Sequence, residues 1–355
     1  MTQESELTLE QLGWAPDHAE AFSEHAVAGL QAGRVAIEHR GAYVLRGDGE
    51  VWAELSGRLR RAASTPVDRP AVGDWVAYEH TPGAPRARIQ AVLPRRSAFV
   101  RRAAGELEVE QVVAANVDVL FVVSSMDGDL NPARLERYLT LAWESGADPV
   151  IVLTKADLCE TREEALRLVE TVAFGVPVEV TSAVTGEGVR RVAERLQGRT
   201  GATVGSSGVG KSSLINALCG DDRMATAEVR DDGRGRHTTS HRELIVLPDG
   251  GCLIDTPGMR ELQLWDASEG IERAFADVEQ LAADCRFRDC VHETEPDCAV
   301  QAAIAEGSLA AERLESYRRL LRELAFHGQR NDKRARSEMR KQWAAFSKSM
   351  RTDSW

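Results

Sequence analysis

Short segments in which apolar and polar residues alternate dominate the chain from about residue 33 to residue 110. They are separated by Gly, Pro and Asp, and they read RVAIEHR, AYVLRG, VWAEL, DWVAYE and ARIQAVL. Alternation with a period of two predicts strands with one buried face, and short strands at this spacing predict a small antiparallel barrel. A five-stranded barrel of the oligonucleotide-binding (OB) type fits the length, and other small barrels share the pattern.

From residue 112 onward, apolar runs alternate with segments of helical periodicity. The runs VDVLFVVSS, DPVIVLTKAD and VPVEVTSA predict buried strands, and the segments between them predict helices. Such alternation predicts an α/β domain with a parallel sheet covered on both faces. From about residue 270 the chain reads as helical, apart from a cysteine cluster, and it ends in a basic amphipathic tail.

These patterns divide the 355 residues into four parts. We expect an acidic, loosely attached lead-in at 1–30, an OB-fold RNA-binding barrel at 31–110, the α/β domain at 111–268, and a mainly helical domain with a basic helical tail at 269–355. No apolar run is long enough for a membrane span, and the N terminus does not resemble a secretory signal. We therefore expect a cytoplasmic protein without a membrane partner.

Charge is distributed unevenly along the chain. The net charge of −12 argues against nucleic acid as a partner. However, residues 58–102 carry ten Arg against three acidic residues, and residues 327–355 carry eight Lys and Arg against three. Because local charge governs association more than the total does, both segments are candidate RNA-binding surfaces. For each, an ordinary solvated surface is the alternative.

The segment GSSGVGKS at 205–212 satisfies the phosphate-loop pattern GxxxxGK[ST]. Its glycines let backbone N–H groups surround the α- and β-phosphates, and the following helix adds its positive N terminus. We expect Lys211 at the β- and γ-phosphates and Ser212 on Mg²⁺. A glycine-rich turn without a ligand is the alternative. The predicted nucleotide-binding residues of this loop are Gly205, Ser206, Ser207, Gly208, Val209, Gly210, Lys211, Ser212 and Ser213.

Two later segments fit the switch regions of a GTPase. DTPG at 255–258 ends an apolar run, so that Asp255 is placed to hold Mg²⁺ through water and the Gly258 N–H to sense a γ-phosphate. In GRGRHTTS at 233–240, Thr239 is preferred over Thr238 as a further magnesium ligand. The Gly and Arg content of this segment is typical of a mobile switch. A flexible loop without a role is the alternative.

The motif TKAD at 154–157 indicates which base is bound. Asp157 can accept hydrogen bonds from N1–H and the 2-amino group of guanine, which adenine does not offer, while the stem of Lys155 packs over the base. Thr154 replaces the usual Asn, a departure expected to loosen the base pocket. Alone, TKAD is more often an ordinary strand-to-helix cap. The TSA at 181–183 adds Ser182 and Ala183, where a backbone N–H supports guanine O6.

The order of these motifs is unusual. Base specificity and base support precede the phosphate loop, whereas GTPases ordinarily begin with that loop. All the motifs lie at the C-terminal edge of one parallel sheet, so the chain can be cut and rejoined with only its connections changed. The sequence therefore predicts a circularly permuted P-loop GTPase domain.

This order, with a barrel before it and cysteines after it, resembles the circularly permuted, ribosome small subunit-dependent GTPases of the YjeQ/RsgA family. The resemblance covers roughly residues 33–300. It implies a GTP hydrolase that binds the 30S subunit and its 16S rRNA, assists late maturation, and turns over faster on the ribosome. We expect a monomer that uses GTP with Mg²⁺.

The cysteine cluster CRFRDCVHETEPDC spaces Cys285, Cys290, His292 and Cys298 as C-x4-C-x-H-x5-C. Three thiolates and an imidazole suit tetrahedral Zn²⁺, and such a closed set is structural because no position remains for water. The family that the chain resembles has the same spacing. The alternatives are buried reduced cysteines with a surface His, or Glu293 as a ligand in place of His292.

The residue that promotes hydrolysis is not evident from the motifs. Ras-like GTPases place a water-positioning Gln after D-x-x-G, but this chain has Met259, which predicts slow intrinsic turnover. The resemblance implies that His237 is the catalytic residue, and a solvated loop His is the alternative. Met259 also favours a second function, an RNA-binding module that uses GTP as a binding-state sensor with little hydrolysis.

Overall fold

The computed structural model describes residues 7–103, 109–220, 242–255 and 268–325. The chain forms two compact units, residues 1–263 and residues 264–355. Within the described ranges, no helix combines the length and the apolar character needed to cross a membrane.

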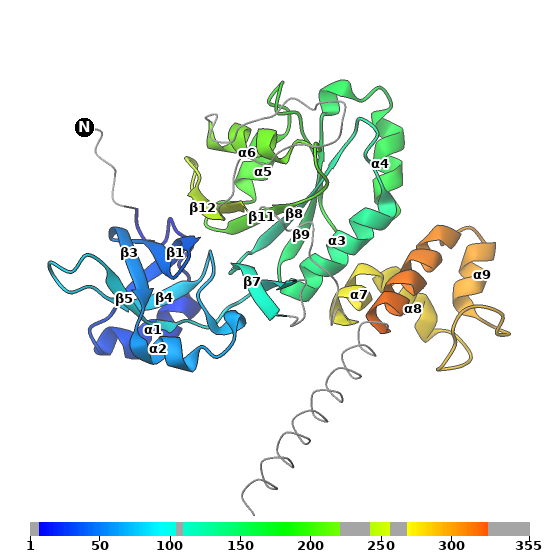
Figure 1. Ribbon diagram of the computed structural model, residues 1–355. Coiled ribbons are helices and arrows are strands. Elements are labelled where there is room, and N and C mark those ends of the chain that lie inside the picture. Colours follow the sequence, from blue (N-terminus) through cyan, green and yellow to red (C-terminus); the bar gives the residue numbers. More distant parts are fainter. Residues whose placement is uncertain (1–6, 104–108, 221–241, 256–267, 326–355) are drawn as a thin grey trace, which may run out of the picture. The chain divides into compact units, whose positions relative to one another are not determined.

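The first unit begins with a closed five-stranded barrel (Figure 1). The strand order is β1-β2-β3-β5-β4, and β4 closes the barrel by pairing with β1. The interior is filled by alternate side chains such as Val35, Leu45 and Ile89, which confirms the five predicted strands. The elements are β1 (Gln31–His39), β2 (Ala42–Gly47), β3 (Gly49–Leu55), α2 (Gly57–Ala62), the 3₁₀ turn η1 (Pro66–Asp68), β4 (Trp75–Glu79) and β5 (Ala87–Val92).

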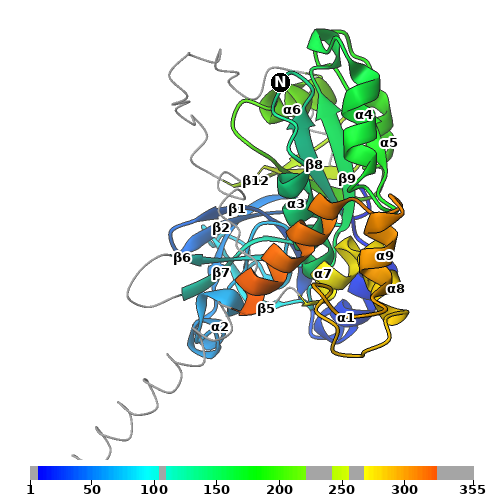
Figure 2. The same cartoon turned by 90° about the vertical axis from the view of Figure 1, so that its right-hand side faces the viewer.

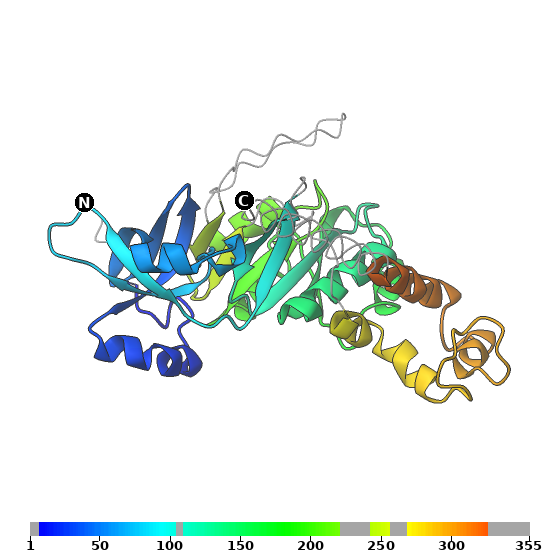
Figure 3. The ribbon, with the colours of Figure 1, turned by 60° about the horizontal axis from the view of Figure 1, so that its bottom comes forward.

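The segment before the barrel is packed against it. Helix α1 (Pro16–Val27) contacts β1 and β4, as the dark blue helix in Figure 3 shows. Leu12 is fully buried. The rings of Trp14 and Trp75 pack edge to face, with their centroids 4.6 Å apart. The expectation of a loosely attached lead-in is therefore wrong for residues 7–27. A few side chains, scattered among acidic residues, suffice to anchor the segment, although many of its residues are exposed.

A separate hairpin follows the barrel. Strands β6 (Ala98–Ala103) and β7 (Val109–Ala115) pair only with each other among the described strands. Val112 and Ala115 pack with Ala71 in a small core of their own. The sequence predicted no separate hairpin here.

The second part of this unit is the α/β domain. Its sheet has the order β10-β9-β8-β11-β13-β12, in which every neighbouring pair is parallel except β13–β12. The strands are β8 (Val119–Ser125), β9 (Asp148–Thr154), β10 (Val178–Val180), β11 (Thr200–Val204), β12 (Glu243–Val246) and β13 (Cys252–Asp255). The helices are α3 (Pro132–Ser145), the 3₁₀ turn η2 (Ala156–Leu158), α4 (Arg162–Glu170), α5 (Val189–Glu194) and α6 (Lys211–Cys219).

Alternate residues of the strands enter two different cores, as expected for a sheet covered on both faces. Phe121 and Val123 of β8 pack in one cluster with Val192 of α5 and Leu214 of α6. The intervening Leu120 and Val122 are equally buried, and α3 contacts both β8 and β9. The apolar runs in the sequence reflect this burial on both sides.

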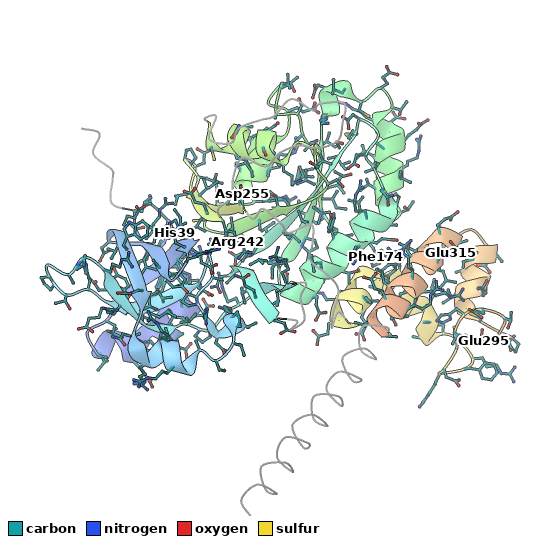
Figure 4. The ribbon with its side chains drawn as sticks, viewed as in Figure 1. His39, Phe174, Arg242, Asp255, Glu295 and Glu315 are labelled. Atoms are coloured by element: carbon teal, nitrogen blue, oxygen red, sulfur yellow. The ribbon has the colours of Figure 1, made fainter. Side chains whose placement is uncertain are left out.

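The barrel and the α/β sheet are joined edge to edge. Strand β1 pairs antiparallel with β12, with Ile37 opposite Glu243, so that one continuous sheet runs through both parts. Arg46 donates to the carbonyl oxygen of Leu244 at 2.8 Å. The guanidinium group of Arg242 lies 3.6 Å from the carboxylate of Glu38. Glu38 precedes His39 in the chain, and Figure 4 labels His39 and Arg242.

A buried arginine holds the same junction together. Arg34 on β1 is fully enclosed, and burial lowers the pKa of its guanidinium. It donates hydrogen bonds to Thr200 Oγ1 at 2.8 Å and to the carbonyl oxygens of Leu12, Gly73 and Asn116. These partners come from four separate segments, so one side chain links the lead-in, the barrel and β11.

The second unit is helical (Figure 2). Its core includes Phe275, Val278 and Val300, and Arg313 pairs with Asp277 at 2.7 Å while lying 4.2 Å from the Phe275 ring centroid. A loop that carries the cysteine cluster separates its two halves. Its helices are α7 (Ser268–Ala274), α8 (Ala276–Ala283), α9 (Ala299–Ala305) and a helix over 311–325.

Candidate functional site

The predicted nucleotide motifs converge on one edge of the α/β sheet. TKAD begins at the last residue of β9, TSA follows β10, the phosphate loop follows β11, and Asp255 ends β13. Because these strands are parallel neighbours, their carboxyl ends lie at the same edge. Ligands of open α/β sheets bind at this edge.

The phosphate loop has a backbone that demands glycine at its first position. Gly205 has φ +156°, and a Cβ there would lie 2.2 Å from the carbonyl oxygen of Val123. Val209 is buried in the core and anchors the loop, while Ser207 and Gly208 are exposed. Helix α6 then begins at Lys211, with Ser212 half-buried in its first turn. The loop thus presents a helix N terminus, which attracts phosphate.

The side chain of Lys211 lies along this loop. Its Nζ donates to the carbonyl oxygen of Gly205 at 2.9 Å and also to that of Ser206. An ammonium group held at the loop is close to where phosphate charge would bind. Asp255 is half-buried, and burial raises the pKa of its carboxyl group, while Lys211 acts in the opposite direction.

Thr154 connects the base motif to the phosphate loop. Its side chain is buried, and its Oγ1 hydrogen-bonds the carbonyl oxygen of Val209 and lies 3.3 Å from that of Ser124. The short side chain that was expected to loosen the base pocket therefore fastens β9 to the loop.

The next residues of the motif are also held by neighbouring strands. Lys155 Nζ donates to Asp127 Oδ2 at 2.7 Å. Asp157 Oδ1 accepts from Ser182 Oγ at 2.5 Å, and Ser182 is fully buried. Ala183, one residue later, is exposed. The hydroxyl of Ser182 thus orients the carboxylate predicted to read the base. Sequence reasoning assigned Ser182 by position and missed Asp127, which belongs to no recognised motif.

Three of the predicted site residues lie outside the described part of the chain. They are His237, Thr239 and Gly258, and Thr238 and Met259 share this position. Their roles stay predictions from the sequence.

The structure brings the four predicted metal ligands together. The thiol sulfurs of Cys285, Cys290 and Cys298 and a ring nitrogen of His292 all lie within 4.8 Å of one another. The Cys285 and Cys298 sulfurs are 3.8 Å apart, and His292 Nδ1 lies 3.6 and 3.5 Å from them. A sulfur separation of this size excludes a disulfide between that pair, whose bond would measure about 2.05 Å.

These distances fit a tetrahedral metal ion. With Zn–S of about 2.3 Å and Zn–N of about 2.0–2.1 Å, a tetrahedron has edges of about 3.8 Å between sulfurs and about 3.5 Å between sulfur and nitrogen. His292 and Cys298 are buried, whereas Cys285 and Cys290 are half-buried. This Cys3His cluster can therefore hold a metal ion.

The loop around the cluster is fixed by further contacts. Glu295 accepts hydrogen bonds from the backbone N–H groups of Val291, Glu293 and Thr294 at 2.8 to 3.1 Å. Its own backbone N–H, followed by these bonds, holds the pKa of its carboxyl group below the usual range. Glu293, the alternative ligand, is exposed and outside the cluster. His292 is thus the fourth member.

Comparison with known proteins agrees with this geometry. Residues 92–265 match the model of the RsgA GTPase family. The chain is 47% identical over 343 residues to the small ribosomal subunit biogenesis GTPase RsgA of Streptomyces coelicolor, covering 94% of this chain and 92% of that protein. The protein of the same name from Opitutus terrae is 46% identical over 338 residues, covering 92% of each. The chain belongs to the RsgA family of GTPases.

Solved structures of similar fold match this RsgA-family chain as well. The crystal structure of YjeQ from Thermotoga maritima matches with a TM-score of 0.63 and 28% identity, covering 83% of this chain and 99% of that one. YloQ, described as a circularly permuted GTPase, matches with a TM-score of 0.62 and 24% identity over 83% of this chain and 95% of that one. The permuted GTPase fold predicted from the motif order is confirmed.

Proposed function

We propose that this chain is a ribosome-assembly GTPase that binds the 30S subunit and assists its late maturation. It hydrolyses GTP to GDP and phosphate, and the subunit stimulates its turnover. The observation that carries the proposal is the convergence of the permuted GTPase motifs on one sheet edge, in a chain 47% identical to a named small-subunit biogenesis GTPase. Such an enzyme works in the cytoplasm, and we propose that it does so as a monomer.

The proposed site divides into phosphate, base and metal parts. Residues 205–213 surround the phosphates, Ser212 and Thr239 hold Mg²⁺, and Asp255 and Gly258 link the ion and γ-phosphate to switch two. Thr154, Lys155, Asp157, Ser182 and Ala183 form the guanine site. The contacts of Thr154 and Ser182 support these assignments because they fix the motif to the loop and the carboxylate in place.

The Cys3His cluster is proposed to hold one structural Zn²⁺. Its sulfur and nitrogen separations fit a tetrahedron, and thiolate and imidazole ligands suit this ion. The ion would join the loop to α9, whose N-cap is Cys298, and so stabilise the helical unit. We propose the boundaries 31–110, 111–268 and 269–355 for the barrel, the GTPase domain and this zinc domain.

The barrel is proposed to contact 16S rRNA through its arginines. Arg58, Arg60 and Arg61 on α2 are all exposed, as is Arg88 on β5. Arg88 pairs with the half-buried Glu54 at 2.7 Å, and Arg60 lies 3.9 Å from the same carboxylate. Arg95 is held by the fully buried Asp74 at 2.7 Å and serves the fold. Exposed guanidinium groups on a barrel of this type suit contacts with RNA phosphates.

His237 is proposed to orient or activate the attacking water once the subunit orders switch one. Met259 cannot perform this role, because a thioether is a poor hydrogen-bond acceptor. We expect His237→Ala to retain nucleotide and 30S binding and to lose most of the stimulated hydrolysis. Normal hydrolysis by His237→Ala on 30S subunits would refute the assignment.

Met259 also supports the second candidate function, an RNA-binding module that senses GTP with little hydrolysis. Multiple-turnover GTP hydrolysis with and without 30S subunits separates the two. We expect the subunits to increase turnover strongly, since switch ordering completes the site. If they leave the rate unchanged while binding the GTP-loaded chain, the sensor function is correct and the proposed enzyme is not.

A further inference from the structure

We propose that Asp127 is a positioning residue of the nucleotide site, which holds the Lys155 side chain in place over the guanine base. The proposal rests on the guanine site assigned above and extends it to a residue outside the GTPase motifs. It begins from the ion pair between Lys155 Nζ and Asp127 Oδ2, 2.7 Å apart.

The backbone of the sheet brings these residues together. Strands β8 and β9 are parallel neighbours, with Ser125 opposite Thr154, and the N–H of Met126 continues the ladder by bonding the Thr154 carbonyl oxygen at 2.9 Å. Asp127 and Lys155 are the residues that follow this last pairing. The register of the two strands therefore determines their contact.

The backbone around each of the two residues has a defined conformation. Lys155 has a left-handed backbone conformation, φ +56°, which turns the chain sharply after β9. The turn after Asp127 is anchored farther on, because Arg134 pairs with Asp129 at 2.8 Å and Asn131 Oδ1 caps α3 through the Arg134 N–H at 3.0 Å. The carboxylate of Asp127 is thus presented by a fixed loop.

The charge state of Asp127 supports the contact. Partial burial acts to raise the pKa of its carboxyl group, but hydrogen bonds from Lys155 and Ser125 outweigh that effect and hold the pKa below its usual range. The carboxylate is therefore ionised at neutral pH and pairs with the ammonium group. Both side chains are about a quarter exposed, at 26% for Lys155 and 29% for Asp127, so a ligand can still reach the lysine stem.

The consequence for binding is preorganisation. A free lysine side chain loses rotational freedom when a ligand immobilises it, and this loss weakens binding by about threefold to tenfold. Asp127 imposes that restriction before the base arrives. It also keeps the ammonium group beside the base, leaving the phosphates to Lys211, whose Nζ already lies at Gly205 and Ser206.

The test is equilibrium binding of GDP to the full chain, with dissociation followed by a fluorescent GDP analogue. We expect Asp127→Asn to weaken GDP binding by about threefold to tenfold, mainly through faster dissociation. In a Lys155→Met background, which keeps the apolar stem, Asp127→Asn should have no further effect. For GTP hydrolysis by Asp127→Asn, KM should rise while kcat at saturating GTP stays the same. Loss of folded protein would instead lower the apparent kcat and leave KM unchanged.

Asp148→Asn is the matched control. Asp148 begins β9 at the opposite edge of the sheet and pairs there with Arg199 at 2.6 Å. It should leave GDP binding unchanged. The proposal is overturned if the Asp127→Asn variant binds GDP as tightly as the unmodified chain or more tightly. It is also overturned if Asp127→Asn weakens GDP binding by the same factor in the Lys155→Met background. If the unmodified chain fails to bind GDP, the proposed function itself is wrong.

Discussion

The hydroxyl of Thr154 hydrogen-bonds the carbonyl oxygen of Val209, so the end of β9 is tied directly to the phosphate loop. The contact is buried, and it joins residues that belong to different motifs of the site. A change at the base motif therefore acts on the phosphate loop as well.

Replacing Thr154 by Val should weaken nucleotide binding. The substitution keeps the shape but removes the hydroxyl, which leaves the Val209 carbonyl oxygen without this donor at a cost of about 1 kcal/mol. We expect the GDP dissociation constant to rise about fivefold in a calorimetric titration. Thr154→Ser, which retains the hydroxyl, is the control and should bind nearly normally. Equal affinities for the Val and Ser variants would contradict the role of this hydrogen bond.

Replacing two arginines of α2 should weaken 30S binding in a salt-dependent way. Arg58 and Arg61 are exposed, and each proposed phosphate contact contributes about 0.7–0.9 to the slope of log affinity against log salt. Arg58→Ala/Arg61→Ala should bind more weakly at low salt and with a shallower slope. Arg190→Ala on α5, which removes an exposed arginine elsewhere, should leave the slope unchanged. A double variant with the original slope would exclude α2 from the RNA surface.

Removal of the metal should unfold the helical unit. The purified chain should contain about one Zn²⁺ per molecule, and a strong chelator should remove it with loss of helical circular dichroism. Cys290→Ser should lose the ion, whereas Cys159→Ser, which changes a half-exposed cysteine of the first unit, should retain it. Full zinc content in Cys290→Ser would rule out the assigned ligand set.

The packing of α1 should depend on pH through His18. Burial, followed by the charge of Arg96, lowers the pKa of this imidazole to about 4, against the opposing charges of Asp17 and Asp118. Because the folded pKa lies below the unfolded value of 6.5, its stabilising contribution is complete above pH 6.5 and is lost as the pH falls toward 4. The loss amounts to at most about 1.4 kcal/mol per pH unit.

Thermal unfolding between pH 7 and pH 4 tests this dependence. His18→Phe removes the titrating group and fits the aromatic surroundings of Trp14 and Trp75. Its melting temperature should fall less with decreasing pH than that of the unmodified chain. Parallel pH profiles for the two proteins would show that His18 does not titrate as stated.

Local patterns predicted most of the fold because they record burial directly. The alternation in β1 to β5 marks the side chains that fill the barrel interior, although β2 and β4 are buried on their outer faces as well. The apolar runs of β8 and β9 correspond to burial on both faces of the sheet. The motif order predicted the permutation, because parallel strands place their carboxyl ends at one edge. In the same way, the cysteine spacing predicted a cluster that a short loop can close.

Residues whose partners lie far away in the sequence were not predictable in this way. Asp127 acquires its role only from the register of β8 against β9. Arg34 reads as a polar residue on a barrel strand, yet its partners Leu12 and Thr200 come from distant segments. Leu12, which is buried, and Trp14, which contacts Trp75, stand among acidic residues, so that the composition concealed these contacts.

The pairing of β1 with β12 has a consequence for any attempt to divide the protein. An exposed edge strand carries unpaired N–H and C=O groups that recruit other chains, and natural proteins cover such edges. Here the barrel provides the cover for β12. A GTPase fragment that begins after the barrel would expose β12 as an unpaired edge strand. Self-association of such a fragment would result from the missing β1 and would not be a property of the intact enzyme.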